Sequence, residues 1–84
     1  GLVNLVVPLP ELMPTAKEWA RRICQNGPLA LRAAKESMMV GINMTLEEGL
    51  KLEKSLVDKL LMTEDAKEGV KAFNEKRKPV FKGR

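Results

Sequence analysis

The sequence contains no histidine and a single cysteine, Cys24. The absence of histidine excludes the Cys–His and Ser–His pairs that activate most thiol and hydroxyl nucleophiles. One cysteine cannot form an internal disulfide, and without histidine it is not a ligand set for a transition metal. We therefore predict no metal site and no nucleophilic catalysis. We expect Cys24 to be a buried or half-buried thiol on a helix, in a reducing compartment.

Aromatic residues and long apolar runs are also scarce. The chain has two Phe, one Trp and no Tyr, so any core must be built from aliphatic side chains. No apolar stretch reaches the roughly 20 residues needed to span a bilayer. The opening GLVNLVVPLP lacks the basic start and the cleavage site of a signal peptide. With 84 residues, 44% hydrophobic and 31% charged, the composition is typical of one soluble folded domain. We predict a cytoplasmic protein with no membrane partner.

The positive charge is concentrated at the end of the chain. Residues 1–66 hold eight Lys or Arg against nine Asp or Glu, whereas residues 67–84 hold seven against two. The tail cations could complement the end of a helix dipole, or a Phe and a Lys could clamp a phosphate-bearing ligand. A nucleic-acid surface is a third reading. Because the rest of the chain is slightly acidic and no DNA- or RNA-binding motif is present, we predict no nucleic-acid partner.

The first half of the chain predicts an extended lead and two helices. Residues 2–7 are a β-branched run that indicates one strand or an extended segment. The first helix is expected to stop at Asn26, with Gly27 in the left-handed conformation and Pro28 opening the second helix. The apolar faces of these helices consist of Leu12, Ala16, Trp19, Ala20 and Ile23, followed by Leu31, Ala34, Met38 and Ile42.

The TLEE stretch, residues 45–48, predicts the start of a third helix. Thr45 and Glu48 have the spacing of a capping box, in which each side chain bonds the other residue's amide. Glu47 and Lys51 form a favourable i, i+4 ion pair on the exposed face of the same helix. Leu46, Leu50, Val57, Leu60 and Leu61 follow at helical spacing.

A fourth helix is predicted after Thr63, which can act as its N-cap. Ala66, Val70 and Phe73 are expected to mark its buried face. Its last turn is expected to contain Lys76, Arg77 and Lys78, before Pro79 forbids continuation. The fold class is therefore all-α, with about four amphipathic helices after a short extended lead.

No group of residues in the sequence has the pattern of a catalytic site. The six glycines are scattered, which excludes a glycine-rich phosphate loop. Nearly all of the eleven carboxylates lie on charged helix faces or in first turns, and no pair stands out for separate acid and base roles. We predict no catalytic residue within these 84 positions.

Four blocks of the sequence closely resemble the C-terminal end of the crotonase superfamily, the enoyl-CoA hydratase/isomerase proteins. The blocks are GLVNLVVP, NGPLALRAAKES, MTLEEGLKLE and TEDAKEGVKAFNEKRKPVFKGR, in the order and spacing of the family. The resemblance covers essentially the whole chain. The last block is the most specific, with matches at Thr63, Asp65, Glu68, Gly69, Phe73, Glu75, Lys76, Arg77, Phe81 and Lys82.

The resemblance implies a parent enzyme, a hydratase (lyase) or isomerase, that acts on acyl-CoA thioesters. In the family the oxyanion-hole residues and the catalytic glutamates precede the segment that begins this chain. Residues 1–84 are therefore expected to be a single C-terminal helical oligomerisation domain, with the catalytic core domain upstream. Coenzyme A enters as part of the substrate, and no separate cofactor is implied. Hydration, isomerisation, dehalogenation and C–C cleavage share this C-terminal pattern, so the resemblance leaves the reaction open.

The resemblance also assigns a role to two residues of the tail. Phe73 and Lys76 match family residues that approach the adenine end of a coenzyme A bound to a neighbouring subunit. The alternative is that Phe73 is a core residue and Lys76 a helix-end cation. Leu61 falls where the family often has an aromatic residue near the acyl pocket.

The family further implies homotrimers, which often pair into hexamers, so the detached chain is expected to self-associate or to swap helices. A different class of function is also open: an autonomous helical interaction module whose basic tail binds an acidic partner.

Overall fold

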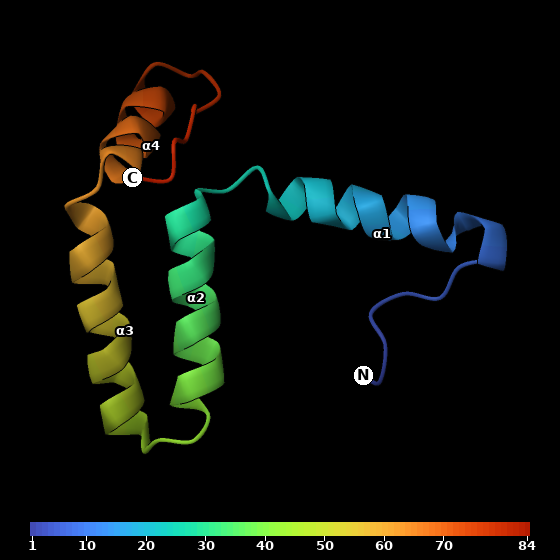
Figure 1. Ribbon diagram of the computed structural model, residues 1–84, viewed down its shortest axis with the longest axis horizontal. Helices are drawn as coiled ribbons and strands as arrows, with labels where there is room; N and C mark the ends of the chain where they lie inside the picture. Colours follow the sequence, from blue (N-terminus) through green and yellow to red (C-terminus); the bar gives the residue numbers. More distant parts are fainter.

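The computed structural model describes residues 1–84 and contains four helices and no strand (Figure 1). The helices are α1 (Leu9–Ile23), α2 (Pro28–Gly41), α3 (Leu46–Leu61) and α4 (Glu64–Asn74). The all-α class predicted from the sequence is confirmed. The first eight residues form an extended lead. They do not form a strand, since no second strand is present to pair with them.

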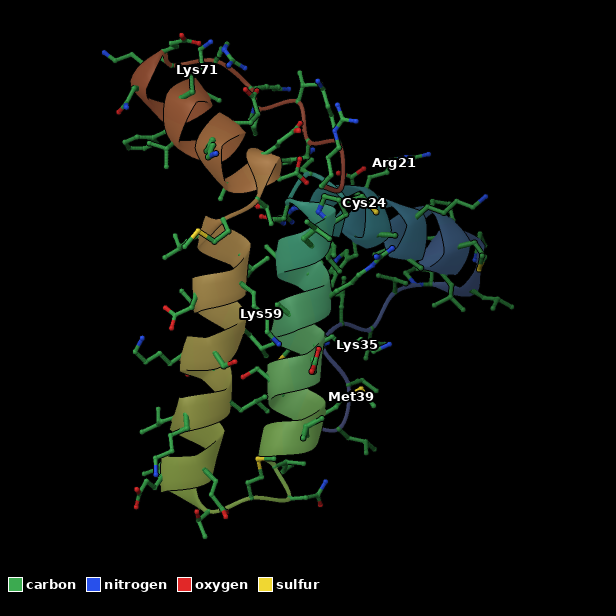
Figure 2. All side chains as sticks on the ribbon, turned by 60° about the vertical axis from the view of Figure 1, so that its left-hand side comes forward. Arg21, Cys24, Lys35, Met39, Lys59 and Lys71 are labelled. Atoms are coloured by element: carbon green, nitrogen blue, oxygen red, sulfur yellow. The ribbon has the colours of Figure 1, made fainter.

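Helix α1 starts earlier than its apolar pattern indicates. Leu9 and Pro10 occupy its first two positions, where a missing proline amide costs nothing because the first amides of a helix lack intrahelical partners. The helix ends at Ile23, and Cys24 is its C-cap residue. Cys24 is exposed, so the prediction of a buried or half-buried thiol is wrong. Figure 2 places it near the junction of α1 and α2.

Helix α1 ends at Ile23, three residues before the predicted stop at Asn26, and Gly27 does not close it as expected. Gly27 has φ −58° and ψ 128°, so the expected left-handed conformation is wrong. The physical reason is Pro28, which starts α2 and pushes the preceding residue toward extended angles. The α1 end is instead closed by the side-chain amide of Asn26, which donates to the Ile23 carbonyl at 2.9 Å.

Helices α2 and α3 form an antiparallel hairpin, the main packed unit of the chain (Figure 1). Leu56 of α3 is buried in it. The capping box is confirmed: the Thr45 amide donates to the Glu48 carboxylate at 2.9 Å, and the Glu48 amide donates to the Thr45 hydroxyl at 3.3 Å. The bond from the Thr45 amide, followed by one from the Thr45 hydroxyl at 2.8 Å, lowers the pKa of the Glu48 carboxyl. The predicted pair of Lys51 with Glu47 is confirmed at 2.7 Å.

Helix α4 begins as predicted, with the Thr63 hydroxyl accepting from the Ala66 amide at 3.1 Å. Its buried face is not the predicted one. Val70 and Phe73 are 65% and 83% exposed, whereas the buried residues of the helix are Asp65 and Ala72. The reason is that the chain after α4 folds back onto the face that carries Asp65 and Ala72.

The chain is open rather than compact. Only four residues are buried, and the radius of gyration is 16.2 Å, against about 12 Å for a compact chain of this length. Helix α1 projects away from the α2–α3 hairpin (Figure 1). Large apolar side chains such as Ile42, Leu46 and Met39 are therefore exposed. None of the four helices has the length and hydrophobicity needed to cross a membrane.

Candidate functional site

The end of α4 reverses the chain through a lysine in the left-handed conformation. Helix α4 ends at Asn74, so Lys76 and the two cations after it lie beyond the helix and not in its last turn as predicted. Lys76 has φ 53°. Its amide donates to the Phe73 carbonyl at 3.2 Å, and the Arg77 amide donates to the Ala72 carbonyl at 3.0 Å. This bond pair is a Schellman motif, which usually places glycine where Lys76 stands.

Residues 77–84, here called the C-terminal segment, then run back along α4 (Figure 1). Glu68 holds the start of this segment. Its two carboxylate oxygens accept from the Arg77 guanidinium at 2.6 and 3.0 Å, and one of them also accepts from the Val80 amide at 2.9 Å. A planar guanidinium that meets both oxygens gives a strong and directional pair. Glu75 adds a third contact, at 2.6 Å from Arg77 Nε.

The contacts of Glu68 favour the ionised form of its carboxyl group. The Arg77 hydrogen bonds, followed by the Val80 amide, lower the pKa of Glu68 from 4.5 to about 2. The hydrogen bonds to Glu68, followed by the one to Glu75, raise the pKa of Arg77. A carboxylate whose pKa falls on folding stabilises the fold fully above its unfolded pKa. That contribution declines as the pH drops from about 4.5 to about 2. Glu68 is therefore ionised and paired at neutral pH, and it is not available as a general base.

Asp65 holds the other end of the C-terminal segment. Its buried carboxylate accepts from the amides of Lys82 at 2.7 Å and Gly83 at 2.8 Å. Gly83 has φ 75°, a left-handed conformation that glycine adopts at no steric cost. In return the Asp65 amide, which lies in the first turn of α4, donates to the Arg84 carbonyl at 2.9 Å. The segment thus supplies an acceptor that the helix start lacks.

The aromatic ring of Phe81 anchors the middle of the segment. It lies 3.6 Å from the position of a Cβ on Gly27 and 3.7 Å from one on Gly69. The ring therefore lies against both the α1–α2 turn and the α4 backbone, at ordinary van der Waals distance from these two positions. A hollow of about 590 Å³ remains beside the ring. It is lined by Cys24, Gln25, Asn26, Pro28, Leu31, Lys78, Pro79 and Phe81.

The two residues predicted as ligand contacts both lie on the surface at the end of α4. Phe73 is 83% exposed, so the alternative in which it is a core residue is wrong for this chain. Lys76 is exposed two residues beyond the helix. No carboxylate lies within ion-pair distance of Lys76, whereas Arg77 and Arg84 are paired with α4 carboxylates. An exposed ring near a free ammonium can pack on a purine and meet a phosphate.

The sequence reasoning missed the roles of Asp65 and Glu68. The sequence pattern indicates only helix-face or first-turn carboxylates at these positions, and the family resemblance matches both without assigning them a role. One feature of the sequence does indicate their roles. The acidic residues of α4 are followed by an arginine and by a Pro-containing segment that cannot be helical, so this segment is free to fold back onto them. Leu61, at the end of α3, is 62% exposed. No group of three or more Cys, Asp or Glu lies close enough together to hold a metal ion.

Comparisons with known proteins place these features in a family. The sequence pattern of the enoyl-CoA hydratase/isomerase family matches residues 1–84. A carnitinyl-CoA dehydratase of Salmonella agona (strain SL483) is 46% identical over 88 residues, which cover 100% of this chain and 34% of that protein. An Arabidopsis thaliana relative, whose name assigns it to mitochondria, is 43% identical over 99% of this chain and 28% of its own length.

Solved structures give the same result. The crystal structure of an enoyl-CoA hydratase from Bacillus anthracis superimposes with a TM-score of 0.95 and 45% identity, over 100% of this chain and 33% of that one. The expected crotonase-like architecture is thereby confirmed. The chain spans about a third of the length of the relatives it matches. By sequence and by structure, this chain belongs to the enoyl-CoA hydratase/isomerase family.

Proposed function

We propose that this chain is the C-terminal part of a hydratase or isomerase that acts on acyl-CoA thioesters, with the catalytic core domain upstream. The observation that carries the proposal is the open structure, in which family-matching helices expose apolar faces and bury almost nothing. Such faces need further protein surface to cover them. The share of each relative that the chain covers supports the same reading. The single unpaired cysteine favours a cytoplasmic enzyme.

Within that enzyme, Phe73 and Lys76 contact the nucleotide end of coenzyme A. Two features support this role. The ring and the cation are both exposed at the same end of α4, and the Lys76 ammonium has no carboxylate partner. In addition, a non-glycine residue in the left-handed conformation costs about 1–2 kcal/mol. A lysine kept at a position that glycine fits more easily is consistent with a function for its side chain.

Replacing Lys76 with Ala tests this role. We expect the KM for an acyl-CoA ester to rise about tenfold with little change in kcat, because one charged hydrogen bond to a phosphate is worth about 1.5 kcal/mol. Steady-state kinetics on the enzyme that carries this chain measures both constants. Lys54→Ala, which removes an exposed lysine of α3 paired only with Asp58, is the matched control. An unchanged KM in Lys76→Ala would contradict the role.

The exposed apolar faces also support subunit contacts in a homotrimer or hexamer. We expect light scattering on the isolated chain to give a mass that exceeds one copy and grows with concentration, since open helices gain by covering one another. A monodisperse monomer would contradict this expectation. The alternative of an autonomous module with a basic tail is less well supported. Two of the tail cations, Arg77 and Arg84, are occupied by carboxylates of the same chain.

A further inference from the structure

The conformation of Lys76 depends on contacts made by its neighbours rather than by its own side chain. Glu75 and Arg77, on either side of it, bond each other at 2.6 Å, so Lys76 lies at the apex of a loop closed by an ion pair. Glu68, seven residues before Glu75 in the chain, accepts from the same guanidinium with both carboxylate oxygens. We infer that Glu68 is a positioning residue: through Arg77 it holds Lys76 in the left-handed conformation at the end of α4.

Backbone geometry ties these contacts to the lysine. The Arg77 amide reaches the Ala72 carbonyl, at 3.0 Å, only when the intervening lysine turns the chain through the left-handed region. Because this conformation is unfavourable for lysine, it persists only where surrounding contacts over-determine it. Glu68 provides such contacts just after the turn, through its bidentate ion pair with Arg77 and its hydrogen bond from the Val80 amide.

The same arrangement keeps the Lys76 charge free. Two carboxylates, Glu68 and Glu75, lie near the turn, and both are engaged by the single guanidinium of Arg77. Without Arg77 either carboxylate would be left to attract the Lys76 ammonium. The ion pairs of Arg77 therefore keep both carboxylates away from the Lys76 ammonium, and they also hold the Lys76 backbone in place. What Lys76 then binds rests on the function proposed above, but how it is held does not.

The decisive experiment is amide hydrogen exchange on Glu68→Gln in the enzyme that carries this chain. The substitution keeps the side-chain volume but removes the charge, and it turns one of the two acceptors of Arg77 into a donor. We expect faster exchange at the Arg77 and Val80 amides, with unchanged exchange in the α2–α3 hairpin. Glu47→Gln is the control, since it removes an equal charge from an exposed α3 pair at the far end of the hairpin.

Kinetics with two substrates separates this inference from the proposed function. If both hold, Glu68→Gln raises the KM for an acyl-CoA ester about fivefold, as expected for a displaced binding group. It leaves the KM for the matching acyl-pantetheine ester unchanged, because that ester lacks the nucleotide. In a Lys76→Ala background the same substitution should then add nothing.

The outcomes can be told apart. Unchanged protection of the Arg77 amide in Glu68→Gln overturns the inference, whatever the KM values are. Faster exchange with no change of KM in either Glu68→Gln or Lys76→Ala supports the inference and contradicts the coenzyme A role of Lys76. If Glu68→Gln does not fold, Arg77→Lys serves instead. It keeps the charge and loses the planar fork, so retained protection at residue 77 would overturn the inference.

Discussion

Replacing Asp65 with Ala is expected to lower the free energy of opening of the C-terminal segment by about 2–3 kcal/mol. Asp65 is 6% exposed, and its carboxylate accepts from two backbone amides, those of Lys82 and Gly83. Removing it leaves both amides without a protein acceptor, at about 1–3 kcal/mol for each group that water cannot reach. Lys82 and Gly83 are themselves exposed, so water recovers part of this loss and the expected effect stays below the full sum.

Hydrogen exchange at these two amides measures the effect directly. Asp58→Ala provides the control, because Asp58 is a carboxylate of α3 whose side chain is 57% exposed and bonds only Lys54. Exposed pairs of this kind contribute about 0.3–0.5 kcal/mol. Asp65→Asn should fall between the two variants, since an amide side chain keeps one acceptor oxygen but presents a donor in place of the other. Equal protection in Asp65→Ala and Asp58→Ala would refute a clamping role for Asp65.

Replacing Leu56 with Ala is expected to destabilise the α2–α3 hairpin by about 2–3 kcal/mol. Leu56 is the one large apolar side chain that this chain buries, at 9% exposure, and it lies against α2. The loss combines the transfer of the removed methyl groups with the space left behind. The expected value lies at the low end of the range for buried leucines because the surrounding groove is open to solvent and can partly close.

Leu46→Ala on the same helix is the matched control, because Leu46 is 80% exposed and loses little contact when truncated. Exchange rates of the central α2 and α3 amides report the stability of the hairpin in both variants. If the two substitutions destabilise the hairpin equally, a surface outside this chain covers Leu46. Leu56 would then not be the dominant packing residue of the pair.

The sequence predicted best those features that depend on a few neighbouring residues. The capping box at Thr45 and Glu48, the Thr63 cap and the Pro28 helix start were all predicted and are all present. Each involves groups no more than three residues apart, so the local conformation alone brings them together. The spacing of apolar residues likewise predicted four helices, although their ends moved by a few residues.

The sequence-based predictions failed where they depended on which distant part of the chain packs against a given residue. The apolar pattern put Val70 and Phe73 on the buried side of α4, but the side that is buried is the one on which the C-terminal segment lies. Gly27 was expected to need a left-handed conformation. Gly27 instead has an ordinary negative φ, and the Phe81 ring, 54 positions away in the sequence, packs beside it, 3.6 Å from where a Cβ would lie. Neither contact leaves a periodic signal in the sequence.

By itself, the sequence determined the four helices, their caps, the absence of His-dependent chemistry and the concentration of cations in the last 18 residues. Only the tertiary structure decided how those cations are used. It pairs Arg77 with Glu68 and Arg84 with Glu64, and it leaves Lys76 free at a reversed helix end. The physical reason is distance along the chain. A cap is closed within one helical turn, whereas the partners of the C-terminal segment meet only when the chain doubles back on α4.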